Sequence, residues 1–290
     1  MNSGWEAGAV SAEQVVARLA SRDNVFVHGA AATPTTLLDA MERRGDLEGV
    51  RLYHLHLEGP LAFLEPRYDG QFRSISLFTG PACRTPIAEG RADYVPIFLS
   101  DIPSLFTSRD VPLDAALIQL SPPDAHGFCT LGPSVDAARA AVDSAGMVLA
   151  EINHQMPRTH GNALVPLSRL TAYTITDRPL HEHGNGKGDA VTAQIGEHVA
   201  ALVNDGATLQ MGIGAIPDAV LSRLFDKHDL GVHTEMFSDR LVDLVEAGVI
   251  TNRHKPTQTG RISTSFVNGT RRLFDFIDDN PLVHFHGCDW

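Results

Sequence analysis

The sequence is poor in cysteine, in basic residues and in long apolar runs, and each shortage excludes a class of protein. Three cysteines in 290 residues are too few and too scattered for a disulfide framework, so we expect reduced thiols. The formal net charge of −12 disfavours a nucleic-acid surface. No apolar run is long enough to cross a bilayer, and the polar amino terminus does not resemble a signal sequence. We therefore expect a cytoplasmic protein with no nucleic-acid or membrane partner.

The remaining composition is ordinary for a globular protein. Hydrophobic residues make up 43% and charged residues 20% of the chain. The length exceeds that of a usual single core, so two domains are expected. Residues 179–188 are rich in glycine and polar side chains and form the best linker. We place the domains at residues 1–180 and 190–290.

A strand, loop and helix pattern occurs twice in the second half of the chain. The apolar run 207–211 meets Gly212 and Gly214 before a helix, and the run 230–233 stops at Glu235 before another helix. Alternating strands and helices predict an α/β fold with mostly parallel sheets, and such sheets bind ligands beyond the carboxyl ends of their strands. The glycine turn and Glu235 are therefore expected side by side.

The glycine turn and the glutamate suit a site that stabilises negative charge. Gly212 and Gly214 leave bare N–H groups at a helix amino terminus. Beside them, Glu235 can act as a base, a metal ligand or a nucleophile. Two plainer interpretations stay open, a solvated acid at a strand end and glycines that permit tight packing. The turn lacks the third glycine of the dinucleotide fingerprint, which disfavours a nicotinamide site.

The first half of the chain has two similar strand ends. The buried run 24–27 leads into a small-residue loop and a helix, and the run 115–120 leads into a proline-stiffened loop. The first geometry suits a phosphate or thioester, although the residues alone favour a simple strand-to-helix turn. These loops carry candidate site residues: His28, Gly29, Asp124, His126 and Gly127.

Paired histidines and one basic loop raise the questions of a metal site and of an anion site. No carboxylate or cysteine is placed at ligand spacing from His54 and His56, and His181 and His183 lie in a polar linker, so no metal is predicted. Arg158 and His160 form a candidate local positive patch. The three histidine pairs are His54 with His56, His181 with His183, and His284 with His286.

Sequence motifs in both parts of the chain are typical of one enzyme family. The second half contains QMGIGAIPDAVL (Gln210–Leu221), GVHTEMFSD (Gly231–Asp239) and VDLVEAGVITN (Val242–Asn252). The first half contains HGAAATP (His28–Pro34), SPPDAHGFCTLGPSVD (Ser121–Asp136) and INHQMPRTHGN (Ile152–Asn162). Together these segments resemble the acetyl-CoA hydrolase/transferase family, which includes 4-hydroxybutyrate, butyrate and acetate CoA-transferases.

This resemblance implies roles for individual residues. The family's covalent nucleophile is the glutamate of the HTEM segment, which corresponds to Glu235. Its glycine loop lies near the thioester carbonyl, so Gly212 and Gly214, with Gln210 beside them, are implied to form the oxyanion and CoA-binding residues. The loops after residues 27 and 120 then become candidate walls of an acyl pocket: His28, Gly29, Asp124, His126 and Gly127.

The implied activity is CoA transfer between an acyl-CoA and a small carboxylate through a glutamyl-CoA thioester. Coenzyme A is then a substrate, and no cofactor is expected. A homo-oligomer is expected as well. Two rival functions stay open: an acyl-CoA hydrolase that uses the same glutamate, and a non-catalytic relative with an incomplete site.

The sequence departs from the family pattern in two places. Arg240 stands where the family usually has glycine, and it either crowds the helix start or supplies positive charge. The family also continues beyond the position of Trp290, so the second domain is expected to be incomplete. We then expect the strands at 263–267 and 281–285 to leave apolar surface exposed, causing association.

Overall fold

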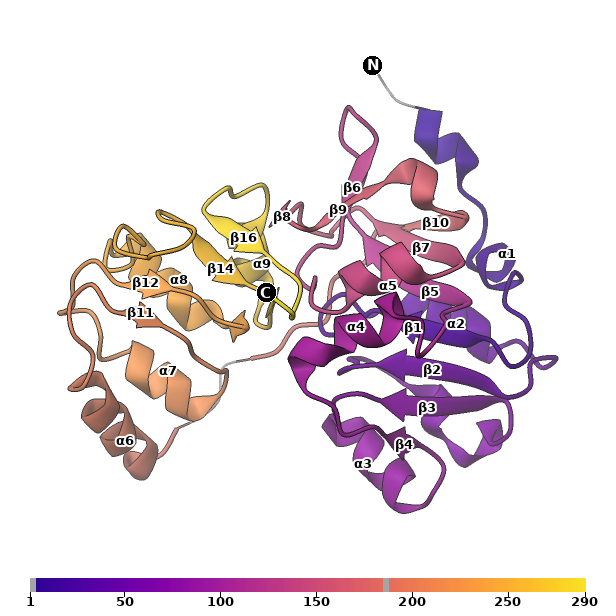
Figure 1. Ribbon diagram of the computed structural model, residues 1–290, viewed down its shortest axis with the longest axis horizontal. Helices are drawn as coiled ribbons and strands as arrows, with labels where there is room; N and C mark the ends of the chain where they lie inside the picture. Colours follow the sequence, from indigo (N-terminus) through magenta and orange to yellow (C-terminus); the bar gives the residue numbers. More distant parts are fainter. Residues whose placement is uncertain (1–3, 185–187) are drawn as a thin grey trace. The chain divides into compact units, whose positions relative to one another are not determined.

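The structure, a computed structural model, describes residues 4–184 and 188–290, which form two compact units (Figure 1). Unit 1 comprises Met1–Arg158, Ala163–His181 and Gly287–Trp290, and unit 2 comprises Thr159–Asn162 and Glu182–His286. The expected linear division did not foresee that 159–162 and 287–290 are exchanged between the units. The middle of the expected linker, 185–187, lies outside the described residues.

Unit 1 is built on a parallel sheet of seven strands. In the described chain its order is β10-β7-β5-β1-β2-β3-β4, and every neighbouring pair is parallel. The inner strand β5 is buried along its whole length, which explains its apolar sequence AALIQL. The strands are β1 (Asn24–Val27), β2 (Val50–His54), β3 (Phe72–Ser76), β4 (Asp93–Tyr94), β5 (Ala115–Leu120), β7 (Met147–Asn153) and β10 (Ala172–Thr176).

Short helices flank this sheet and bury their apolar faces (Figure 1). The spacing of Ser11 and Gln14 predicts a capping box, and the structure confirms it, since each side chain bonds the other residue's amide. A short antiparallel pair of strands, β6 (Phe128–Thr130) and β9 (Leu164–Pro166), also belongs to unit 1. The α-helices are α1 (Ala12–Val16), α2 (Thr35–Glu42), α3 (Pro81–Ala88), α4 (Ile102–Thr107) and α5 (Ala138–Ser144). The 3-10 helices are η1 (Gly4–Gly8), η2 (Ala62–Leu64), η3 (Pro66–Tyr68), η4 (Leu99–Asp101) and η5 (Leu167–Arg169).

The strand order of this sheet reverses between β1 and β5. From β1 the chain proceeds outward to β2, β3 and β4, whereas from β5 it proceeds the other way to β7 and β10. Open parallel sheets bind ligands at such a switch point, beyond the carboxyl ends of the strands. The loops after β1 and β5, which carry the candidate residues of the first half, are therefore at the usual position for a site.

Unit 2 contains several short parallel sheets with helices between their strands. β11 (Thr208–Leu209) pairs with β12 (Gly231–Val232), and β13 (Met236–Phe237) pairs with β15 (Phe266–Val267). A three-stranded sheet has the order β14 (Ile262–Thr264), β16 (Val283–Phe285) and β8 (His160–Gly161). The helices are α6 (Ala190–Ala200), α7 (Ala215–Leu221), α8 (Asp239–Glu246) and α9 (Arg271–Ile277).

One expectation for a single element is wrong. The sequence pattern of residues 94–99 predicts a strand, but β4 ends at Tyr94, and Pro96, which has no N–H to donate, follows two residues later. The apolar run 273–276 lies within α9, where Leu273 and Phe274 are buried. In the described part of the chain, no helix combines the length and the apolar character that crossing a bilayer requires.

The expected exposure of the carboxyl-terminal strands is also wrong. All residues from 263 to 267 are buried, as are Val283 and Phe285. The reason is that β14 pairs with β16, and β16 pairs in turn with β8. Exposed apolar side chains of unit 2 lie instead on and near α6 and α7: Val191, Ile195, Val199, Leu202, Ile216 and Phe225.

Candidate active site

Glu235 lies at a bend between β12 and β13, and its main chain is held by several hydrogen bonds. Its carbonyl oxygen accepts from the amides of Ser265 at 2.9 Å and Phe266 at 3.0 Å, and from Thr264 Oγ1 at 3.1 Å. The residue is half-buried. A backbone with three donors on one carbonyl has little freedom, so the carboxylate leaves the main chain from a fixed point.

Thr234 ties the glycine loop to this bend. Its Oγ1 accepts from the Met211 amide at 3.0 Å and lies 2.8 Å from the Met211 carbonyl oxygen. One residue earlier, the His233 amide donates to the Leu209 carbonyl at 3.0 Å. The structure thus brings the two motifs of unit 2 together, with the loop starting next to the residue that precedes Glu235.

The two glycines of the loop meet different requirements. Gly214 is the N-cap of α7 and has φ 107° and ψ −172°, a conformation that essentially only glycine adopts. Gly212 has no such restriction, and a Cβ placed there would lie 3.8 Å from Pro217 Cγ. The amides of Gly212, Ile213 and Gly214 have no hydrogen-bond acceptor among the described residues. These N–H groups are therefore available to an oxyanion.

An apolar cavity of about 280 Å³ opens beside the glycine loop. Gln210, Met211 and Gly212 form its loop side, so the predicted residue Gln210 lies at this cavity. The cavity suits an uncharged chain that passes the loop. Its remaining walls come from α6, α7 and their flanks: Val199, Val203, Leu209, Ile216, Pro217, Val220, Leu221 and Leu224.

The start of α8 is fixed by buried acids. Ser238 is the N-cap, but its hydroxyl donates to Asp218 Oδ1 of α7 at 3.0 Å instead of capping its own helix. Asp239 accepts from the amide of Thr270 at 3.0 Å and from its hydroxyl at 2.6 Å, which joins α8 to α9. Arg240 is exposed and lies 3.3 Å from Asp243, so it does not crowd the helix start.

A buried lysine supports the strands that lead to Glu235, and no motif predicted it. Lys255 is 3% exposed, and its Nζ donates to the carbonyls of Val232 at 2.7 Å and Arg261 at 2.6 Å and to Ser263 Oγ at 2.9 Å. A Cβ on Gly231 would lie 2.6 Å from Lys255 Cγ, so that glycine makes room for the side chain. Burial lowers the pKa of Lys255 to about 8.

Histidines form a row across neighbouring strands next to this lysine. His233 bridges Ser263, Ser263 pairs with His284, and His284 pairs with His160. Burial, followed by the nearby His284, His233 and Lys255, lowers the pKa of His286 to about 4, so this ring is neutral at pH 7. Within the described residues, no group of three or more histidines, cysteines or acids is arranged to hold a metal.

The expected positive patch at Arg158 and His160 is wrong. Arg158 lies 2.7 Å from Asp124, and His160 lies 3.1 Å from Asp279. The two residues also belong to different units. Because each is paired with a carboxylate, together they present no free basic surface.

Two of the candidates of the first half lie at the carboxyl end of β1. His28 is buried, its Nδ1 accepts from the Gln119 amide at 3.3 Å and its Nε2 lies 2.6 Å from the Ser134 carbonyl oxygen. Burial lowers the pKa of this imidazole, which is consistent with a neutral ring that carries its proton on Nε2. A Cβ on Gly29 would lie 2.7 Å from the His56 carbonyl oxygen, so the close approach of two loops requires glycine.

The other three candidates form a rigid turn after β5. Asp124 accepts from the amides of His126 and Phe128, each at 2.9 Å, and Gly127 has φ 83°. His126 is exposed. These residues belong to unit 1, whereas Glu235 and the glycine loop belong to unit 2. The assignment of the unit 1 loops to an acyl pocket stays a prediction.

A buried polar network that sequence reasoning missed supports the loop after β1. Glu151 is fully buried and accepts from Arg178 Nε at 2.6 Å, Thr176 Oγ1 at 2.9 Å and Thr36 Oγ1 at 3.1 Å. Arg178 also donates to the Thr33 carbonyl at 2.9 Å. The signal that could have revealed it is an acid inside the otherwise apolar strand MVLAEIN.

Comparisons with known proteins identify the family of this chain. The model of the acetyl-CoA hydrolase/transferase N-terminal domain matches residues 1–181. The chain is 51% identical to the succinyl-CoA:acetate/propanoyl-CoA:succinate CoA transferase of Fasciola hepatica, over 92% of this chain and 56% of the relative. It is 40% identical to the 4-hydroxybutyrate coenzyme A transferase of Clostridium kluyveri, over 97% of this chain and 66% of the relative. The chain therefore spans just over half to about two thirds of the length of these curated relatives.

Solved structures with a similar fold are consistent with this family. RipA from Yersinia pestis superposes with a TM-score of 0.94 at 30% identity, covering 99% of this chain and 69% of that chain. A 4-hydroxybutyrate CoA-transferase from Porphyromonas gingivalis gives a TM-score of 0.82 at 32% identity, with 99% and 69% covered. The sequence motifs, the fold and these comparisons agree, and the chain belongs to the acetyl-CoA hydrolase/transferase family.

Proposed function

We propose that this chain carries the nucleophile of a CoA-transferase, which moves CoA between an acyl-CoA and a small carboxylate. The observation that carries the proposal is the geometry around Glu235. Glu235 is half-buried and its side chain leaves the main chain at a fixed bend. Thr234 joins this bend to a glycine loop, in which the amides of Gly212, Ile213 and Gly214 have no acceptor among the described residues. Such an arrangement suits attack on a carbonyl and stabilisation of the oxyanion that results.

The proposed reaction balances without a cofactor. A carboxylate oxygen of Glu235 attacks the thioester carbon, and the tetrahedral intermediate collapses to an acyl–glutamyl anhydride and a CoA thiolate. The thiolate then attacks the glutamyl carbon of the anhydride and releases the acyl group as a carboxylate, which leaves a glutamyl-CoA thioester. An acceptor carboxylate reverses both steps. In other enzymes that form an oxyanion, removal of one hydrogen-bond donor to it costs about 3–4 kcal/mol, and we expect a similar contribution from each amide of the glycine loop.

The chemistry of the relatives supports the substrate class. The two curated relatives are named for succinyl-CoA, propanoyl-CoA, acetate and 4-hydroxybutyrate, all of which are small acyl groups or carboxylates. The apolar cavity beside Gln210 and Gly212 offers a sheltered path for the uncharged arm of CoA. A homo-oligomer and a cytoplasmic location stay predictions within this proposal.

The direct test follows the transfer of CoA to acetate. The chain is incubated with succinyl-CoA or butyryl-CoA plus acetate, and acetyl-CoA and free CoA are quantified. We expect acetyl-CoA to form in wild type, none above background in Glu235→Gln, and unchanged transfer in Glu246→Gln, a matched exposed glutamate of α8. Free CoA released without dependence on acetate would support the hydrolase instead. Transfer that survives in Glu235→Gln would overturn the proposal.

A further inference from the structure

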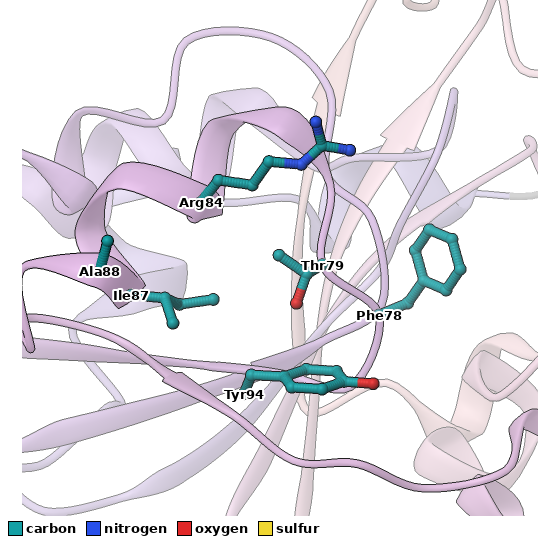
Figure 2. Close-up of a pocket in the computed structure, with 6 residues that line it drawn as sticks. All are labelled: Phe78, Thr79, Arg84, Ile87, Ala88 and Tyr94. Atoms are coloured by element: carbon teal, nitrogen blue, oxygen red, sulfur yellow. The ribbon is translucent and has the colours of Figure 1, made fainter.

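Unit 1 contains a second pocket that the proposed reaction does not use. It has a volume of about 540 Å³ and lies beyond the carboxyl ends of β3 and β4, next to α3 (Figure 2). Small-molecule sites have volumes in this range and often occur at this edge of a parallel sheet. Its walls are Phe78, Thr79, Arg84, Ile87, Ala88 and Tyr94.

Two aromatic side chains of this pocket are unusually open to solvent. Phe78 is 55% and Tyr94 50% exposed. The ring of Phe78 packs edge-on against the ring of the partly buried His56, with 5.6 Å between centroids, so Phe78 is held in place although its outer face is open. Aromatic faces exposed in a concave site are platforms on which a flat ring can stack.

A cation without a protein partner lies in the same pocket. Arg84 extends from α3 on the side of the pocket opposite Tyr94 (Figure 2). Its guanidinium forms no ion pair or hydrogen bond with any residue that the structure describes, whereas the nearby Arg73 and Arg91 are each paired with a carboxylate. An uncompensated arginine beside apolar walls favours a phosphate or a carboxylate.

The wall between these groups contains a polar atom without a partner. Thr79 lies between Arg84 and Tyr94 (Figure 2), and its buried Oγ1 has no hydrogen-bond partner among the described residues. Buried hydroxyls are normally bonded, so an unbonded one in a pocket wall is suited to the polar edge of a ligand. This pocket therefore suits a planar heterocycle that carries an anionic group. The aromatic faces can stack on its ring, Arg84 can pair with its anion, and the Thr79 hydroxyl can bond its polar edge.

We propose that this pocket binds a phosphorylated adenine nucleotide, with the base on the aromatic faces and a phosphate on Arg84. Adenine supplies a flat ring with polar edges, and the phosphate supplies the anion. The same chemistry has two sources, the nucleotide end of CoA and a free adenine nucleotide. The first source rests on the proposed function, and the second does not.

Calorimetric titration of the whole chain tests the proposal. The ligands are CoA, adenosine 3′,5′-bisphosphate, AMP, ATP and pantetheine, the last of which lacks the nucleotide. We expect a nucleotide to bind. Substitution of Arg84 should not change the binding of pantetheine. Arg84→Met and Tyr94→Ala should each weaken nucleotide binding by about tenfold or more, because each removes a charge-assisted or stacking contact. Arg51→Met, at an exposed arginine of β2, should leave binding unchanged.

The relative affinities identify the source. Tighter binding of CoA and adenosine 3′,5′-bisphosphate than of AMP and ATP indicates the nucleotide end of CoA, and the reverse order indicates a free nucleotide. The proposal is wrong if no nucleotide binds wild type at millimolar concentration, or if Arg84→Met and Tyr94→Ala bind as tightly as wild type while melting at the same temperature. Glu235→Gln should retain nucleotide binding, so failure of the proposed reaction and failure of this site are distinguishable.

Discussion

The buried ammonium of Lys255 should make the stability of unit 2 depend on pH in a predictable direction. Its pKa falls from 10.5 to about 8 because the side chain is only 3% exposed. The unfolded chain therefore binds more protons than the folded chain between these two values, and stability rises as the pH increases through this window. A pKa shift of one unit corresponds to about 1.4 kcal/mol. Burial of the charged Lys255 therefore lowers the free energy of unfolding by about 3 kcal/mol at pH 7, and this loss is about 2 kcal/mol smaller at pH 9.5.

Lys255→Met isolates this contribution, because wild type and variant share every other titrating group. Methionine keeps the length of the side chain but loses three hydrogen bonds, to the Val232 and Arg261 carbonyls and the Ser263 hydroxyl. The loss of these hydrogen bonds changes the free energy of unfolding by an amount that does not depend on pH. The pH dependence of the difference between wild type and variant therefore reports the charge of Lys255. We expect the free energy of unfolding of wild type minus that of the variant to rise by about 2 kcal/mol from pH 7 to pH 9.5.

The assay is urea denaturation at both pH values. Far-ultraviolet circular dichroism follows the whole chain, and tryptophan fluorescence follows unit 1, which contains both Trp5 and Trp290. The pH-dependent difference should appear in the circular dichroism signal. A difference between wild type and variant that stays constant with pH, or that falls as the pH rises, would refute the argument that Lys255 is a buried charge.

Four further substitutions test the loop, the network and the bend. Gly214→Ala should lower both the melting temperature and the transfer rate, because φ 107° strains any side chain by about 1–3 kcal/mol, whereas Gly212→Ala should lower the rate alone. Equal loss of stability in both variants would make the loop a packing feature. Glu151→Gln should destabilise unit 1 by about 3–5 kcal/mol, because Arg178 loses its buried carboxylate, and an effect below about 1 kcal/mol in a tryptophan-monitored denaturation would contradict this. Ser265→Ala should raise the melting temperature, since its buried hydroxyl has no partner among the described residues, and a lower melting temperature would show that the hydroxyl is satisfied.

The parallel architecture was predictable because it follows from local pattern. The strand at 24–27 and the strand at 115–120 were expected at the bounds that β1 and β5 have, since short buried apolar runs between turn signals have few alternatives. The adjacency of Glu235 and the glycine loop followed from the same alternation, because carboxyl ends of neighbouring parallel strands meet at one edge. These inferences needed no knowledge of distant contacts.

The supports of the site were not predictable, because they depend on contacts between distant segments. Glu151 meets Thr36 and Arg178, which lie 115 and 27 residues away in the sequence. Lys255 reaches Val232 across 23 residues and needs the space that Gly231 leaves. The partners of Glu151 and Lys255 do not lie at a fixed sequence spacing that a motif could show. A single charged residue in a sequence is also usually on the surface.

The pairing of unit 2 was missed for a related reason. The strands at 263–267 and 281–285 were expected to lack partners, but β8 is contributed by residues 160–161, which fall within the expected first domain, 1–180. Two residues are too short for a periodic signal, so sequence patterns could not reveal this strand. The apolar surface that remains exposed is therefore on α6 and α7.

The most direct measurement of the central claim is to trap the covalent intermediate on Glu235. The chain is mixed with an acyl-CoA, treated with borohydride, digested and analysed by mass spectrometry, with Glu235→Gln treated in parallel. Borohydride reduces a glutamyl thioester to an alcohol, so we predict reduction of Glu235 in wild type and of no residue in the variant. A wild-type chain with Glu235 unmodified, or with the CoA group attached to Cys83, Cys129 or Cys288, would contradict the assignment of Glu235 as the nucleophile.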